Sequence, residues 1–385
     1  MDECMLIFET CENFSFYNFT TPMFPPFSSP PPYRAPPAKG GELFYAYATP
    51  IVFVMGTIGC ALSMLVFLSK NLRRLSASRY LAMLSASDMC TLWFYVLVEW
   101  LRRGIQYIFP QVHISFFETA GVCQVWVFFS YLSRLTSAWL IVAFTCERFV
   151  GVCMPMRRRR LASRKDTSKI IFGVFVAASL FSLYKPIMSE IQMFNDMPIC
   201  TSMNSMVYES FILDSIYAAS ITIVPFCIIT VLNCLIIRKF IQRRKSFKTK
   251  FITSECHIRL EFTFILLAIS FFFIALNLPF FVVWVRQFLR SSFLSSNSNS
   301  YETEDSTTFE FWREALLITR TIFYMNYCIN FPLYSLTAAS FRREFKRALT
   351  CSRKRETRFN DTFRQTRNSS SRTYDSAAKY RSSYV

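Results

Sequence analysis

Seven long apolar stretches, separated by short polar connections, dominate the pattern of hydrophobic and polar positions along this chain. A helix rises about 1.5 Å per residue, so about 20 apolar residues cross a hydrocarbon core about 30 Å thick. Such a stretch favours a helix, which closes its own backbone hydrogen bonds where water is absent, and the strict alternation of a barrel strand is not visible. The pattern therefore predicts an all-α membrane protein with a seven-helix transmembrane bundle. The predicted spans are residues 43–69, 80–101, 120–145, 170–187, 211–237, 260–285 and 315–339.

The segments outside the spans divide the chain further. Residues 1–42 form an N-terminal tail, dense in proline between 25 and 37 and expected to be extended, and the bundle occupies residues 43–340. Residues 341–350 predict a short amphipathic helix on the membrane surface, because Phe341, Phe345 and Leu349 share one face with cations between them. Residues 351–385 are rich in Ser, Thr and Arg, which predicts a disordered tail.

The net charge of +18 is concentrated in alternate connections between the spans. Lys and Arg gather in residues 70–79, 157–169 and 238–259 and again after the seventh span, whereas the other connections carry more acids. Nucleic-acid binding would require this charge on a soluble surface, so the pattern instead indicates membrane topology. By the positive-inside rule, we expect a multi-pass plasma-membrane protein with its N-terminus extracellular and its C-terminus cytoplasmic.

Two covalent modifications and one cross-link fit this topology. Asn13 and Asn18 begin Asn-x-Ser/Thr acceptors in the outer tail, so we expect glycosylation there. Cys123 and Cys200 both lie on the outer side, where a disulfide would pin the loop between the fourth and fifth spans to the bundle. Cys351 follows the amphipathic helix and could carry a palmitoyl chain or remain a free thiol. Cys4 and Cys11 could pair or stay free.

Five motifs occur in a fixed order along the spans. They are Glu147-Arg148-Phe149 with Pro155 seven residues after the arginine, Leu84-Ser85-Ala86-Ser87-Asp88, Pro225, Phe273 with Pro279, and Asn330-Phe331-Pro332-Leu333-Tyr334 followed by Phe341. Cys123 lies 25 residues before Arg148, a distance that spans a bilayer with its interfaces. In order, spacing and topology the chain resembles the rhodopsin-like G-protein-coupled receptors over almost all of residues 43–350.

The sequence also departs from that family's pattern. Gly59 is followed by Cys60 where the family usually has asparagine, and the fourth span lacks the usual tryptophan. Asn233 and Asn277 stand where an activation tyrosine and a pocket-floor tryptophan are usual, and Pro332 lies one position late. These departures leave the predicted fold intact and indicate a divergent receptor.

The resemblance implies a switch at the cytoplasmic ends of the helices. Arg148 would pair with Glu147 at rest and turn towards the docking G protein on activation, while Tyr334 would hold the open arrangement. Met156 would enter an apolar pocket of the G protein, or else contact lipid. The alternative for the charged pair is a simple interfacial contact in which both side chains reach for water. The switch residues are Glu147, Arg148, Phe149, Pro155, Met156, Asn330 and Tyr334.

A carboxylate within a span needs a partner or a proton, so Asp88 is a second candidate site. The resemblance places Ser137, Asn326 and Asn330 around it. Oxygen ligands suit a hard cation, so these residues could enclose a sodium ion with water. The alternative is a hydrogen-bonded cluster without metal. Apart from this sodium ion, no cofactor is implied.

The resemblance further implies a ligand pocket in the outer half of the bundle, formed by Glu99, Ser130, Arg134, Asn277, Arg320 and Tyr324. Arg134 could bind a ligand carboxylate or amide, or be satisfied by its neighbours. Glu99 and Arg320 could grip charges on a peptide or pair with each other. Ser130 stands where amine receptors keep an aspartate, and Tyr324 where opsins carry the retinal lysine, so both ligand classes are disfavoured. Asp214, Arg286 and Arg313 are expected to be solvated charges on the outer rim.

These features together favour a receptor that binds an extracellular neuropeptide and activates heterotrimeric G proteins, similar to invertebrate-style receptors for FMRFamide and thyrotropin-releasing hormone. The alternatives are a decoy or arrestin-biased receptor without G-protein coupling and a seven-helix transporter. Arrestin, receptor kinases and a PDZ protein at the C-terminus are further expected partners. An enzyme is not expected, because the two histidines lie outside the spans and no catalytic or metal-spaced set occurs.

Overall fold

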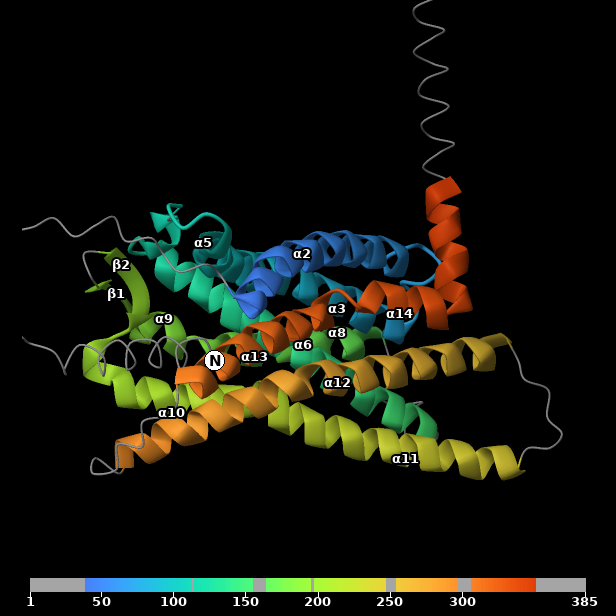
Figure 1. Cartoon of the computed structure of the whole chain (residues 1–385). Coiled ribbons are helices and arrows are strands. Elements are labelled where there is room, and N and C mark those ends of the chain that lie inside the picture. Colours follow the sequence, from blue (N-terminus) through green and yellow to red (C-terminus); the bar gives the residue numbers. More distant parts are fainter. Residues whose placement is uncertain are drawn as a thin grey trace, which may run out of the picture.

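Long helices lying side by side make up most of the protein (Figure 1). The computed structural model describes residues 39–112, 114–154, 164–194, 197–246, 254–296 and 306–350. The principal helices are α2 (Gly40–Phe67), α3 (Ser76–Thr91), α6 (Val122–Cys153), α8 (Arg164–Ser182), α10 (Val207–Ala218), α11 (Val224–Ser246), α12 (Ser254–Ser296), α13 (Ser306–Tyr324) and α14 (Asn330–Thr337). Short helices are α4 (Leu97–Glu99), α5 (Ile105–Ile108) and α9 (Tyr184–Met188). Single 3₁₀ turns are η3 (Ser115–Glu118), η4 (Asn204–Met206) and η6 (Met325–Tyr327).

Six helical segments among the described residues are long and apolar enough to cross a membrane, and they coincide with the first six predicted spans. The seventh predicted span is helical too, but η6 divides it into α13 and α14. α13 also carries the charged residues Arg313, Glu314 and Arg320, which lower its mean hydropathy. α13 nevertheless packs against α2 and α12 and completes the bundle. The predicted fold, an all-α membrane protein, is confirmed.

Wide π-helical turns interrupt two of the spans. η1 (Leu92–Val96) and η2 (Trp100–Gly104) follow α3, and η5 (Ala219–Ile223) lies between α10 and α11. Pro225 lies two residues after η5. It has no backbone N–H to donate to the preceding turn, and its ring crowds the carbonyl group of that turn. These turns change which side chains face the bundle interior above and below them.

α6 is the central helix of the bundle. It packs against α3, α8, α9, α11 and α12. In its most apolar stretch of 18 residues 78% of the residues are buried, whereas the corresponding share for the segment Asp166–Met188 is 22%. Small side chains such as Ser130, Ser133 and Ala138 are buried along it, and they let neighbouring helices approach closely. Polar groups on α6 therefore face several helices at once.

A β-hairpin covers part of the end of the bundle opposite α14 (Figure 1), and the sequence did not predict it. β1 (Ser189–Phe194) pairs antiparallel with β2 (Met197–Ser202) in the register Ser189 to Ser202. Cys200 in β2 forms a disulfide with Cys123 near the start of α6, with their Cα atoms 5.8 Å apart. The predicted disulfide is thus confirmed, and it fixes the hairpin to the central helix.

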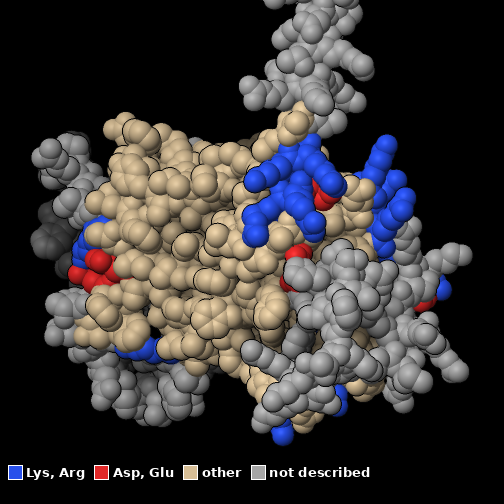
Figure 2. All heavy atoms as spheres, turned by 90° about the vertical axis from the view of Figure 1, so that its right-hand side faces the viewer, with Lys and Arg blue, Asp and Glu red and all other residues tan. Residues whose placement is uncertain are grey.

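Residues 339–350 are helical and turn away from α14 (Figure 1). Phe341 is buried, and its ring lies 5.1 Å from Phe67 and 5.7 Å from Tyr334. Leu349, on the predicted apolar face, is 54% exposed. Figure 2 views the end of the bundle on the right of Figure 1 and shows its Lys and Arg side chains in clusters. The exposed cations at this end include Lys70, Arg73, Arg74, Arg342, Arg343, Lys346 and Arg347.

Candidate functional site

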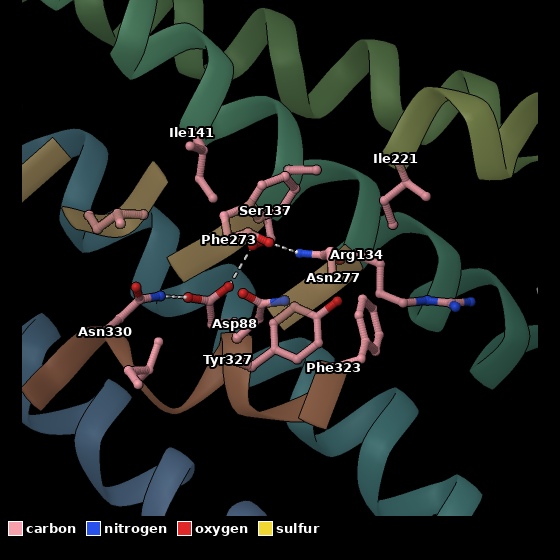
Figure 3. Close-up of a pocket in the computed structure, with 14 residues that line it drawn as sticks. Asp88, Arg134, Ser137, Ile141, Ile221, Phe273, Asn277, Phe323, Tyr327 and Asn330 are labelled. Carbon is pink, nitrogen blue, oxygen red and sulfur yellow. Dashed lines mark hydrogen bonds between the residues drawn. The ribbon is translucent and has the colours of Figure 1, made fainter. Parts of the chain in front are cut away.

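A cavity lies in the middle of the bundle, between α6, α12 and the seventh helical segment (Figure 3). Its apolar lining includes Ile141, Ile221, Phe273 and Phe323. Its polar lining includes Asp88, Arg134, Ser137, Asn277, Asn326 and Asn330. The cavity thus unites the polar cluster predicted around Asp88 with two of the residues predicted for the ligand pocket, Arg134 and Asn277.

Asp88 is held by two short hydrogen bonds although it is 1% exposed. Ser137 Oγ donates to Asp88 Oδ1 at 2.5 Å, and Asn330 Nδ2 donates to Asp88 Oδ2 at 2.6 Å. These contacts join α3, α6 and α14, because each residue comes from a different helix. A buried carboxylate with two donors avoids much of the penalty of lost solvation.

Arg134 lies in a cage of tyrosine rings and is 1% exposed. The guanidinium carbon is 4.0 Å from the centre of the Tyr95 ring, 4.7 Å from that of Tyr131 and 5.7 Å from that of Tyr217. Its Nε donates to the carbonyl of Ser130 at 3.1 Å, one turn earlier on α6. Ring faces attract a cation, so the cage stabilises a charge that the membrane interior would otherwise disfavour.

The remaining residues of the predicted ligand pocket are also buried. Asn277 donates from its amide to the carbonyl of Phe273 at 2.5 Å, within its own helix. Tyr324 is fully buried, with its ring centre 5.4 Å from that of Tyr95. Among the six predicted pocket residues, only Arg134 and Asn277 line the cavity.

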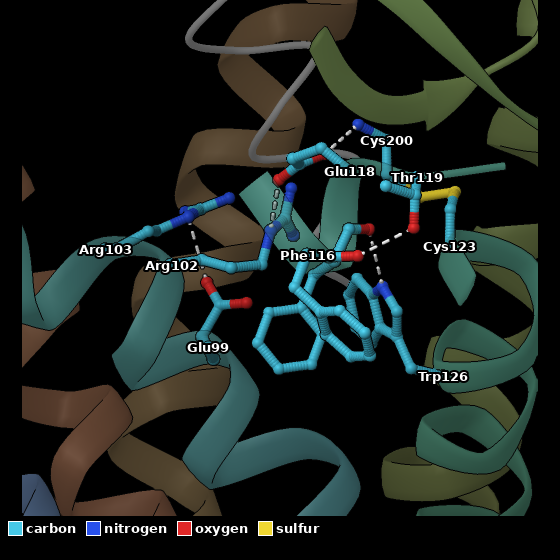
Figure 4. A network of polar contacts seen from close by, with 10 residues as sticks. Glu99, Arg102, Arg103, Phe116, Glu118, Thr119, Cys123, Trp126 and Cys200 are labelled. Carbon is cyan, nitrogen blue, oxygen red and sulfur yellow. Dashed lines mark hydrogen bonds and ion pairs between the residues drawn. A yellow bond between two sulfur atoms is a disulfide. The ribbon is translucent and has the colours of Figure 1, made fainter. Parts of the chain in front are cut away.

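Glu99 lies at the centre of a buried ion-pair network in the half of the bundle nearest the hairpin (Figure 4). Its Oε1 accepts from Arg320 at 2.9 Å and from Arg103 at 3.0 Å, and Arg320 and Glu99 are almost fully buried. Beside it, Glu118 pairs with Arg102 at 2.9 Å and accepts a hydrogen bond from the backbone of Cys200 at 2.5 Å (Figure 4). The network joins the end of the second span to the disulfide-linked hairpin.

A second buried pair was missed by the sequence analysis. Lys185 Nζ lies 2.7 Å from Asp214 Oδ2, and both side chains are 1% exposed. Tyr184 also donates to Asp214, at 2.8 Å, and Tyr131 does so at 3.3 Å. The expectation of a solvated rim charge at Asp214 was therefore wrong, because α9 turns Lys185 and Tyr184 towards α10. Arg286 lies over the ring of Trp312, and Arg313 pairs with Glu42.

At the other end of α6, Glu147 and Arg148 lie close together. Arg148 NH2 is 3.4 Å from Glu147 Oε1, which also accepts a 2.5 Å hydrogen bond from Ser76 Oγ at the start of α3. Arg148 is 7% exposed and lies over the ring of Phe144. Phe149 packs against the hydrophobic core, and Tyr334 is fully buried between Phe67 and Phe341. Pro155, Met156, Asn13, Asn18 and Cys351 lie outside the described residues.

The helical bundle, the polar core and the buried arginine at the end of α6 together indicate a multi-pass helical membrane protein. Residues 60–334 match the model of the 7 transmembrane receptor (rhodopsin family), and the chain belongs to that family. It is therefore a membrane receptor by family, as the resemblance predicted.

Individual relatives are more distant. The chain is 24% identical over 324 residues to neurotensin receptor type 1 of Rattus norvegicus, covering 78% of this chain and 74% of that one. It is 24% identical over 334 residues to the thyrotropin-releasing hormone receptor of Gallus gallus, covering 78% and 77%. It is 23% identical over 228 residues to the probable G-protein coupled receptor B0563.6 of Caenorhabditis elegans, covering 55% and 50%.

Proposed function

We propose that this chain is a receptor for an extracellular neuropeptide and that it activates heterotrimeric G proteins. The observation that carries the proposal is the similarity, over 78% of the chain, to receptors named for neurotensin and thyrotropin-releasing hormone, both of which are peptides. The proposal includes the topology expected from charge, with the hairpin end extracellular and the basic end cytoplasmic.

The charges of the outer half support a peptide rather than a small amine. Glu99, Arg103 and Arg320 share one buried network, and Lys39, Glu310, Glu42 and Arg313 form further ion pairs nearer the outer end. A peptide offers backbone amides and charges of both signs that can exchange with such pairs. Ser130 offers no carboxylate for an amine, since its hydroxyl and carbonyl are neutral.

The inner end supports coupling to a G protein. Arg148 is held at rest by Glu147 on the same helix, and Glu147 is itself held by Ser76 of α3. A ligand that binds more tightly to an arrangement in which Arg148 has left this position shifts the population towards that arrangement. The size of the shift depends on the difference between the ligand's affinities for the two states. Arg148 is then available to a docking helix of the G protein.

The test is nucleotide exchange in membranes that carry the full chain. A library of synthetic neuropeptides is screened for peptide-dependent GTP-analogue binding to added heterotrimeric G proteins. The Arg148→Ala variant should lose exchange while surface expression and peptide binding persist. Arg343→Ala, which removes an exposed arginine from the same end, serves as the matched control.

Two results would contradict the proposal. Full exchange by Arg148→Ala would remove the assigned switch. Arrestin recruitment without exchange, for a peptide that binds, would favour the decoy or arrestin-biased receptor, to which the unusual residues Asn277, Asn233 and Pro332 give some weight.

A further inference from the structure

The space around Asp88 could hold a sodium ion or a hydrogen-bonded cluster without metal, and its donors and acceptors distinguish the two. A hard cation needs several oxygen atoms turned towards it. Both oxygens of Asp88 already accept hydrogen bonds, from Ser137 at 2.5 Å and from the amide nitrogen of Asn330 at 2.6 Å. Asn330 thus presents a donor to the carboxylate, where a sodium site would use the amide oxygen (Figure 3).

Two neighbouring side chains add hydrogen-bond donors near this carboxylate. The amide nitrogen of Asn326, which lines the cavity, is buried and has no hydrogen-bond partner among the described residues. Cys60, at the position where the family usually has asparagine, donates its thiol to the carbonyl of Tyr327 at 3.4 Å. A water molecule can accept from an N–H group and donate to a carboxylate, whereas a sodium ion cannot accept a hydrogen bond. The polar lining therefore fits water.

A permanent positive charge adjoins the same cavity. Arg134 lines it and is 1% exposed, and a guanidinium does not lose its proton in proteins. Its head group is directed away from Asp88 (Figure 3) and is held by the rings of Tyr95 and Tyr131. Its field reaches the cavity through the low-dielectric interior and opposes the entry of a second cation.

We propose that the Asp88 cavity binds water in place of a sodium ion, and that the positive charge of Arg134 prevents sodium from binding there in the resting receptor. Two hydrogen-bond donors already stabilise the charge of Asp88, and Arg134 places a permanent positive charge beside the same cavity. Among the described residues that line the cavity, removing Arg134 leaves Asp88 as the one that is charged, which raises the affinity of the cavity for a cation. The proposal depends on neither the peptide ligand nor the G protein.

The experiment measures the thermal unfolding midpoint of the purified full chain in about 150 mM sodium chloride and in potassium chloride of the same strength. We expect equal midpoints for the wild type. Arg134→Met should gain a rise of about 3 °C in sodium over potassium, since an ion that binds only the folded state stabilises it. Adding Asp88→Asn should abolish that rise. Arg313→Met, which removes an arginine with a 44% exposed side chain near the outer rim, should behave as the wild type.

A sodium-selective rise in the wild type that Asp88→Asn abolishes would overturn the proposal. A folded Arg134→Met variant without such a rise would overturn the role of Arg134. Should Arg134→Met fail to fold, Arg134→Gln keeps a polar side chain in the cage and permits the same comparison. The wild-type measurement by itself decides whether the cavity takes sodium.

Discussion

At the scale of single residues, the buried charges of this receptor are held in two ways. Glu99 and Asp214 form ion pairs with cationic neighbours. Glu99 pairs with Arg103 and Arg320, and Asp214 pairs with Lys185. Arg134 instead lies against three aromatic rings. Both arrangements reduce the cost of a charge in a low-dielectric interior, and both need side chains from several helices.

We predict that Glu99→Gln destabilises the protein by about 3–5 kcal/mol, because it leaves two arginines around a neutral amide in a buried site. The thermal unfolding midpoint of the purified chain should fall markedly. Glu310→Gln, which alters an exposed ion pair with Lys39, should have little effect. Equal midpoints for the two variants would show that the Glu99 network contributes nothing to stability.

The sequence predicted some of these contacts better than others. Asp88, Ser137 and Asn330 come together as expected, because family motifs fix their depth in the membrane. The pair of Lys185 and Asp214 escaped prediction, although only 29 residues separate them. Each lies near the outer end of a span, where composition alone does not distinguish a solvated charge from a buried one. Their contact depends on the turn of α9, which the periodicity does not reveal.

At the scale of the elements, helices were predictable and the hairpin was not. Apolar stretches long enough to span a bilayer predicted six of the helical segments that the structure shows. β1 and β2 have six residues each within a polar connection, too short for a strong pattern. The π-helical turns also escaped prediction, although Pro225 lies two residues after one of them. The hairpin matters because Cys200 joins it to the central helix α6.

We predict that Cys200→Ser lowers the free energy of unfolding by about 2–5 kcal/mol, since the disulfide closes a loop with a sequence separation of 77. The variant should also lose peptide binding, because the hairpin is no longer fixed above the outer network. Unfolding midpoints and surface expression provide the measurement. Cys90→Ser, which changes an exposed free cysteine, is the matched control. Wild-type stability in Cys200→Ser would contradict this role.

At the scale of the whole molecule, the two ends of the bundle differ in charge. The end near α14 carries many exposed cations, including Arg73, Arg342 and Arg343 (Figure 2). The half nearest the hairpin carries networks that combine acids and bases, centred on Glu99 and Glu118. By the positive-inside rule, this asymmetry predicts that the basic end lies in the cytoplasm. The signalling account requires this orientation, because peptide and G protein meet the chain in different compartments.

The most direct test of the account is the accessibility of epitope tags fused to the two termini of the full chain. Seven crossings predict that antibodies label the N-terminal tag on intact cells, and the C-terminal tag only after permeabilisation. Labelling of both tags from the same side of intact cells would contradict a seven-span receptor and, with it, the transfer of a signal from one face of the membrane to the other.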